Sequence, residues 1–93
     1  MWNIVEHRRI ARQVRRLPVD IVKRYQKWKD IMTLSGPAGI RMIRGFRDES
    51  LQGEWQGHRS SRLNEQYRVI YRLENGLAKV AVVSVTPHDY RRK

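Results

Sequence analysis

The chain has 93 residues, enough for one domain with a single modest hydrophobic core. We expect this domain to comprise residues 1–93. It contains no cysteine, which excludes disulfide bonds, thiolate nucleophiles and zinc–thiolate sites. Twenty lysines and arginines stand against nine aspartates and glutamates, a formal net charge of +11. An excess of this size is typical of proteins that bind polyanions, because it otherwise only repels itself. We therefore expect nucleic acid as the partner, with an acidic protein as the second choice.

The sequence has no feature of a secreted or membrane protein. Its first residues lack the order of basic, then apolar, then small residues that marks a signal peptide. The longest apolar run, residues 77–85, is interrupted by Lys79 and is far too short to span a membrane. The composition thus predicts a cytoplasmic protein without membrane contact.

The N-terminal half predicts one strand followed by two helices. Residues 2–6 alternate loosely, as a short strand would, and apolar residues then recur at helical spacing over residues 7–17. Pro18 ends this helix and can open a second one, which we expect to run to about Leu34 before a Ser-Gly-Pro stop. Two helices with apolar stripes form a hairpin that needs a sheet to cover.

The C-terminal half predicts a three-stranded meander. Residues 37–53 predict irregular structure, and strands follow over 54–63, 66–73 and 77–86, with a type I′ hairpin signal at Asn75-Gly76. The last strand is almost continuously apolar, as a central strand covered on both faces would be. The order of elements predicts an α+β fold with the helical hairpin packed on one face of the antiparallel meander. The other face is left open.

Strand alternation predicts which side chains share this open face. Tyr67 and Tyr71 are expected in the core, whereas Arg68 points the other way. A charge in the middle of a strand is costly without a partner, so we interpret Arg68 as functional, and we expect Arg59 and Arg72 to be solvated. The groups expected to converge on this face are His58, Ser60, Arg62, Arg68, Arg72, His88 and Tyr90.

Such a set of side chains suits metal-free cleavage of a phosphodiester. A base removes the proton of a ribose 2′-hydroxyl, cationic donors stabilise the phosphorane, and an acid protonates the leaving 5′-oxygen. Arginine offers forked donors to the nonbridging oxygens, and histidine exchanges a proton near neutral pH. The carboxylates Asp48, Glu49 and Glu54 match no dedicated metal loop, so we expect neither a metal nor a cofactor.

Three blocks of the sequence resemble the RelE/ParE superfamily of toxins from type II toxin–antitoxin pairs. They are residues 49–55 (ESLQGEW), 59–71 (RSSRLNEQYRVIY) and 83–90 (VSVTPHDY), and the length and order of elements agree as well. The resemblance implies a ribosome-dependent mRNA endonuclease that acts in the ribosomal A site and inhibits translation. It also implies a cognate antitoxin that holds the toxin inactive in a hetero-oligomeric complex.

The resemblance further assigns roles to matching residues. Arg68 matches the arginine that stabilises the transition state, and Arg62 matches a second strand arginine. His88 and Tyr90 match in kind the C-terminal histidine or tyrosine of YoeB and HigB members, although one residue separates them here. Glu49 matches the glutamate base of YoeB-like members, and the lysines that RelE uses are absent, so the base is Glu49 or His88. The RNA-binding residues expected beside them are Trp55, His58, Arg59, Arg91 and Arg92.

Two other functions remain open from the sequence. A ParE-like toxin has the same fold but poisons DNA gyrase by binding, and it would not need Arg68 together with His88 and Tyr90. A non-catalytic basic RNA-binding module would bind RNA with a steep salt dependence and would have no antidote protein.

Overall fold

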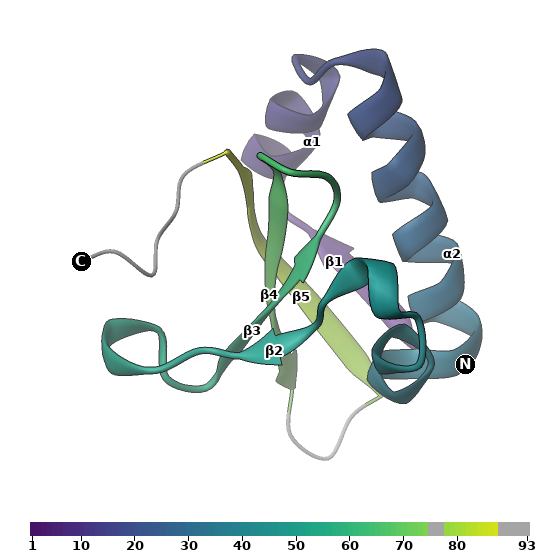
Figure 1. Ribbon diagram of the computed structural model, residues 1–93, viewed down its shortest axis with the longest axis vertical. Helices are drawn as coiled ribbons and strands as arrows, with labels where there is room; N and C mark the ends of the chain where they lie inside the picture. Colours follow the sequence, from purple (N-terminus) through teal and green to yellow (C-terminus); the bar gives the residue numbers. More distant parts are fainter. Residues whose placement is uncertain (75–77, 88–93) are drawn as a thin grey trace.

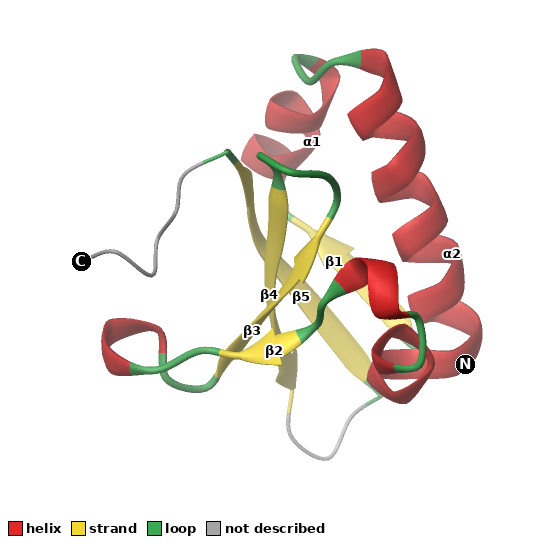
Figure 2. Ribbon diagram, viewed as in Figure 1, coloured by secondary structure: helices red, strands yellow, loops and turns green. Residues whose placement is uncertain are grey.

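The computed structural model describes residues 1–74 and 78–87, so the expected Asn75-Gly76 turn lies outside the described residues. Both helices lie on one side of a five-stranded sheet (Figures 1 and 2), whose strand order is β1-β5-β4-β3-β2. In the ranges described, neither helix has the length and apolar character needed to cross a membrane. The elements are β1 (Asn3–Glu6), α1 (Arg8–Arg15), α2 (Val19–Arg41), a 3₁₀ turn (Arg44–Phe46), β2 (Glu49–Ser50), a second 3₁₀ turn (Gly53–Trp55), β3 (His58–Arg62), β4 (Arg68–Glu74) and β5 (Lys79–Thr86).

The α+β class and the antiparallel meander are confirmed, with one strand more than expected. β5 is an interior strand, parallel to the edge strand β1 on one side and antiparallel to the central strand β4 on the other. The additional strand is β2, which pairs with β3 at the far edge of the sheet. It falls within residues 37–53, where we expected irregular structure, because two residues are too few to show an alternation in the sequence.

The second helix continues beyond its expected end at Leu34. Gly36 interrupts it with φ 69° and ψ −170°, and Pro37 then begins a further helical segment that reaches Arg41. The glycine–proline pair therefore predicted the break correctly, but the chain beyond it is helical because proline is well tolerated in a first helical turn. A Cβ atom on Gly36 would lie 2.4 Å from Nε1 of Trp2, so only glycine fits there.

The core lies between the helices and the sheet, and α2 contributes its largest side chains. Trp28 stacks on Tyr25 with ring centroids 5.8 Å apart and meets Tyr71 edge-on at 5.3 Å. Tyr71 is fully buried and Tyr67 packs partly buried against the same cluster, which confirms both expected core positions. The remaining buried members are Ile10, Ile21, Met32, Ile40, Phe46, Leu63, Val69, Val80, Val82 and Val85.

A β-bulge changes the alternation of the last strand. Ile70 pairs with Ser84, but the next residue, Tyr71, pairs with Val82, so Val83 is the extra residue. Val83 packs with Ile70 on the face away from the helices. The expectation that both faces of this strand are covered throughout is therefore wrong: its core face is buried, whereas three of the residues on or turned toward the other face are only half-buried. These half-buried residues are Ala81, Val83 and Ser84.

Candidate active site on the open face of the sheet

The strand register brings several of the expected site residues onto the face turned away from the helices. Arg62 on β3 pairs with Arg68 on β4, and Arg68 pairs in turn with Thr86 on β5. In the neighbouring row, Glu49 on β2 pairs with Ser60. Directly paired residues in antiparallel strands have their side chains on the same face. We call this surface the open face; its polar residues are Glu49, His58, Ser60, Arg62, Arg68, Arg72, Ser84 and Thr86.

Arg62 and Arg68 are two neighbouring cations, the first partly buried and the second almost fully buried. Arg68 is only 9% exposed, and Nε of Arg62 is buried without a hydrogen-bond partner. Among residues 1–74 and 78–87, neither side chain takes part in an ion pair. Like charges directly opposite each other destabilise a sheet, and a buried unpaired charge is costly. An anion such as a phosphate group would neutralise both guanidinium groups.

Strand β3 carries a line of unsatisfied polar atoms along the open face. Buried atoms without a partner in the described part of the chain are Nδ1 of His58, Oγ of Ser60 and Nε of Arg62. Native proteins pair nearly all such atoms, so each exception needs an explanation. Because the three residues alternate along one strand, the atoms share a face, and a bound polar ligand would satisfy them together.

An apolar and aromatic patch adjoins these polar groups. The ring of Trp55 meets that of His58 edge-on, with centroids 5.4 Å apart and an interplanar angle of 89°. Leu51, Ile70 and Val83 pack beside Trp55. An aromatic platform beside arginines is the combination that single-stranded RNA requires, because bases stack on the rings while phosphates meet the cations.

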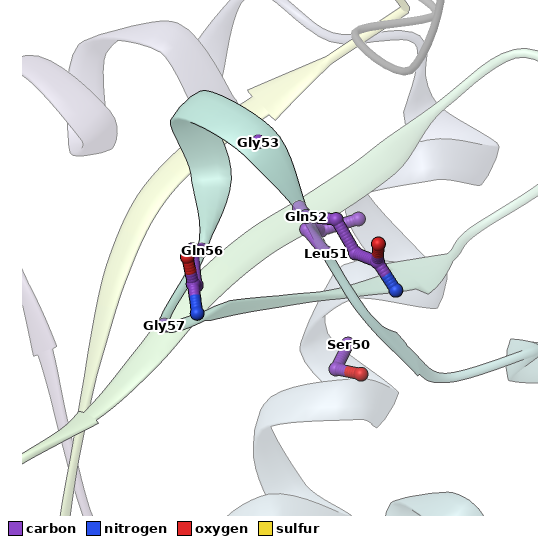
Figure 3. A pocket seen from close by; sticks show the side chains of 6 residues that line it. All are labelled: Ser50, Leu51, Gln52, Gly53, Gln56 and Gly57. Atoms are coloured by element: carbon purple, nitrogen blue, oxygen red, sulfur yellow. The ribbon is translucent and has the colours of Figure 1, made fainter.

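The loop between β2 and β3 forms an open pocket at the edge of this patch (Figure 3). Gly53 and Gly57 have φ angles of 65° and 91°, which allow the chain to turn sharply around it. The amides of Gln52 and Gln56 can both donate and accept hydrogen bonds. Sequence reasoning missed this pocket, although the two closely spaced glycines were a visible signal. Its lining residues are Ser50, Leu51, Gln52, Gly53, Gln56 and Gly57.

On the opposite, core-facing side of the sheet, the carboxylate of Asp48 joins three strands. Its side chain is 0% exposed and accepts hydrogen bonds from Nε of Arg59 at 2.7 Å and Oγ of Ser61 at 2.7 Å. It also accepts one from the hydroxyl of Tyr71 at 2.5 Å. Oγ of Ser61 in turn accepts a hydrogen bond from Nε1 of Trp28 on α2 at 2.9 Å. The expectation that Arg59 is solvated is therefore wrong, because a buried carboxylate binds it.

The groups in this buried network hold their protons firmly. Burial is the main cause that raises the pKa of Tyr71, and the hydrogen bond and negative charge of Asp48 raise it further. Burial acts to lower the pKa of Arg59, but the hydrogen bond and charge of Asp48 outweigh it, so the pKa is raised above its ordinary value. Tyr71 thus stays neutral and Arg59 stays charged near pH 7, and neither can serve as an acid or base there.

The other expected site residues are placed as follows. Arg72 is exposed and lies 3.7 Å from Glu74, which confirms that it is solvated. Arg59 lies on the core-facing side of β3, away from Arg62 and Arg68. Its role in RNA binding stays a prediction. Four residues lie outside the described part of the chain, namely His88, Tyr90, Arg91 and Arg92.

A second basic surface lies on α1, where Arg9, Arg12, Arg16 and Gln13 line a hollow. Oε1 of Gln13 accepts a hydrogen bond from the backbone N–H of Val85 at 3.1 Å, which fixes α1 against the end of β5. We call this surface the α1 groove. Three guanidinium groups around one hollow attract anionic groups.

No protein-family model and no curated protein matches this chain. Solved structures do match it. The RelE–RelB complex from Pyrococcus horikoshii OT3 has a TM-score of 0.73 at 20% identity, over 99% of this chain and 97% of that one. The YoeB–YefM complex from Staphylococcus aureus has a TM-score of 0.71 at 16% identity, over 95% of this chain and 98% of that one. The YoeB/ParE toxin from Agrobacterium tumefaciens has a TM-score of 0.73 at 16% identity, over 92% and 98%.

The chain has the RelE-like fold. The resemblance to the RelE/ParE superfamily is thereby confirmed at the level of the fold. The matching structures carry both YoeB and ParE in their names, so the fold does not choose between RNA cleavage and another activity. That choice depends on the residues of the open face.

Proposed function

We propose that this protein is a toxin of the RelE/ParE superfamily and that it cleaves mRNA in the ribosomal A site without a metal ion. The observation that carries the proposal is the pair of opposed arginines Arg62 and Arg68 beside an aromatic patch, with Arg68 buried and neither arginine in an ion pair within the described ranges 1–74 and 78–87. A protein that only packs against a partner has no reason to keep two opposed guanidinium groups within its sheet. A transition state with extra negative charge on a phosphate does give a reason.

The proposed reaction is an attack of the ribose 2′-oxygen on the adjacent phosphorus. Glu49 or His88 takes the 2′-hydroxyl proton as the O–P bond forms, and Arg62 and Arg68 bind the nonbridging oxygens. The bond from phosphorus to the 5′-oxygen breaks, and His88 or Tyr90 gives that oxygen a proton. The products are a 2′,3′-cyclic phosphate and a 5′-hydroxyl. Each well-placed acid or base contributes a factor of about 10²–10⁴ in rate.

RNA binding is assigned to side chains around this centre. Trp55 and His58 supply the stacking platform, and the α1 groove supplies further phosphate contacts. Arg59, Arg91 and Arg92 belong to the proposal as sequence-based predictions. The net charge of +11 supports a role on ribosomal RNA.

We propose a cognate antitoxin protein as the second partner. The similar structures include the complexes YoeB–YefM and RelE–RelB, which supports a hetero-oligomer of the same kind here. An acidic antitoxin would complement the positive charge of this chain. We also propose that the protein acts in the cytoplasm, where translation takes place.

The test of the proposed function is cleavage on programmed ribosomes. Wild-type protein should cut mRNA at the A site and leave a 2′,3′-cyclic phosphate, with EDTA present, whereas Arg68→Ala should not. Arg72→Ala is the matched control, since Arg72 is a solvated arginine on the same strand. The proposal would be refuted if the wild-type protein left the mRNA uncut on ribosomes whose A site is vacant.

The alternative function is inhibition of DNA gyrase by a ParE-like toxin, and the structure named YoeB/ParE toxin is the observation in its favour. A supercoiling assay separates the two functions. Inhibition of gyrase without any mRNA cleavage would establish the alternative. RNA binding without cleavage or growth arrest would instead establish a non-catalytic basic module.

A further inference from the structure

Asp48 and Glu49 are consecutive residues with side chains on opposite faces of the sheet. The side chain of Asp48 is fully buried on the core-facing side, and Glu49 pairs with Ser60 on the open face. The hydrogen-bond partners of Asp48 on β3 are Arg59 and Ser61, the two residues on either side of Ser60. The carboxylate of Asp48 is thus bonded to β3 on both sides of Ser60, the residue that pairs with Glu49.

Strand β2 pairs with β3 over a short length, which the hydrogen bond from the N–H of Leu51 to the carbonyl of His58 extends by one step. It comprises only Glu49 and Ser50, so its backbone pairing with β3 is short. Arg47, the residue before Asp48, has a φ of 42°, a left-handed conformation that is unfavourable for a side chain of this kind. Asp48 lies between this strained residue and the short strand, and its three hydrogen bonds anchor the chain at that point.

We infer that Asp48 is a positioning residue that sets the place of the Glu49 carboxylate relative to Arg62 and Arg68. Its bonds to Arg59 and Ser61 fix Glu49 along β3, and its bond to Tyr71 ties the same point to β4. The hydrogen bond from Trp28 to Ser61 connects this anchor to α2. The inference rests on the proposed function, because it concerns the group that takes the 2′-hydroxyl proton. It commits to Glu49 rather than His88 as that group.

The test is a double-mutant cycle of Asp48→Asn and Glu49→Gln, measured as single-turnover cleavage on programmed ribosomes. Asparagine keeps the shape of Asp48 but replaces one acceptor oxygen by an N–H₂ donor facing the donors around it. A displacement near 1 Å costs about 100-fold in rate, so Asp48→Asn should slow cleavage by a factor of about 10–100 with ribosome affinity unchanged. In the Glu49→Gln background, Asp48→Asn should have no further effect.

Tyr71→Phe is the second variant, because it removes one hydrogen bond from Asp48 but keeps the carboxylate and the buried ring. It should fold as the wild type does and slow cleavage several-fold, again only when Glu49 is present. A loss of ribosome affinity, or equal losses with glutamate and with glutamine at residue 49, would show a merely structural role and overturn the inference. So would an Asp48→Asn variant that folds and cleaves normally.

The outcomes separate this inference from the proposed function. If Arg68→Ala abolishes cleavage but Glu49→Gln does not slow it, the inference fails and the proposed function stands. If the wild type does not cleave at all, both fail. If Asp48→Asn and Glu49→Gln each slow cleavage, and the double variant is no slower than Glu49→Gln alone, the inference is supported.

Discussion

Arg62 and Arg68 lie directly opposite each other on neighbouring strands of the sheet. Like charges in this position destabilise a sheet, and Arg68 is almost fully buried as well. The pair is therefore unfavourable for folding in the free protein. A side chain that is costly for the fold and placed beside a recognition surface is expected to serve a ligand.

Arg68→Met should separate folding from activity. Methionine keeps the apolar stem without the charge, so we expect the free energy of unfolding to rise by about 0.5 kcal/mol, and more at low salt. Cleavage should fall about 10²–10³-fold, because one cationic donor to the transition state is lost. Urea unfolding at two salt concentrations and the ribosome assay measure the two effects. Arg72→Met, at a solvated position, should change neither, and a destabilised Arg68→Met would contradict the explanation.

Trp55 should contribute through its ring. Trp55→Ala should weaken binding of single-stranded RNA by about 1–3 kcal/mol, the usual contribution of stacking one base, whereas Trp55→Phe should retain most of the affinity. Fluorescence anisotropy with a short labelled RNA gives both values. Equal losses in the two variants would mean that packing against His58, and not stacking, determines the affinity.

The α1 groove should act through charge alone. Arg12→Ala or Arg16→Ala should each lower ribosome affinity and reduce the salt slope of binding by about one, as the loss of one phosphate contact does. The single-turnover cleavage rate at saturating protein should stay the same. Lys23→Ala on the exposed side of α2 is the control for a general change in net charge. If the slope of log affinity against log salt concentration does not change, the RNA does not bind at the α1 groove.

Alkaline pH should destabilise the fold through two buried tyrosines. Burial raises the pKa of Tyr25 and of Tyr71 above the ordinary value of 10.0, and each also donates a hydrogen bond to a carboxylate, Glu6 and Asp48 respectively. Their contribution is complete below pH 10 and is lost as the pH rises beyond it, because the unfolded chain then releases protons that the folded chain keeps. Unfolding free energies measured from pH 8 to about 11 should show this fall. Tyr25→Phe and Tyr71→Phe should each make it shallower.

Gly36→Ala should be among the most damaging small substitutions. The backbone there is nearly restricted to glycine, and the new Cβ would lie 2.4 Å from the Trp2 ring, so we expect a loss of about 3 kcal/mol. Gly53→Ala is the matched control, since its φ is +65° but nothing lies within 4 Å of the new atom. It should cost only about 1 kcal/mol, the penalty of the left-handed conformation. Equal melting temperatures for the two variants would exclude a role for Trp2.

The features that the sequence predicted well depend on local periodicity. Alternation along β3 and β4 placed Arg62 and Arg68 on one face, because a strand turns its side chains with a period of two whatever lies around it. The apolar stripe of α2 likewise placed Trp28 and Tyr25 in the core. Both predictions required only knowledge of neighbouring residues.

The features that it missed depend on contacts between distant residues. Arg59 looked solvated because its partner, Asp48, comes 11 residues earlier and reaches it only through the pairing of β2 with β3. The same buried carboxylate directly precedes β2, a strand too short to predict. The bulge at Val83 could not be predicted because the strand around it is almost continuously apolar. Such a run has no alternation of apolar and polar residues that would show where the pairing shifts.

The place of β5 between β1 and β4 has a consequence for how the protein is made. β1 and both helices leave the ribosome first, yet β1 pairs with β5, and the core also needs Val80, Val82 and Val85 from that strand. Domains fold as units, so a nascent chain that lacks β5 has apolar faces but no completed sheet. Thr86, which flanks Arg68, comes from the same late strand. We therefore expect the open face to assemble only after β5 has been made, so that a nascent chain without β5 has no complete site.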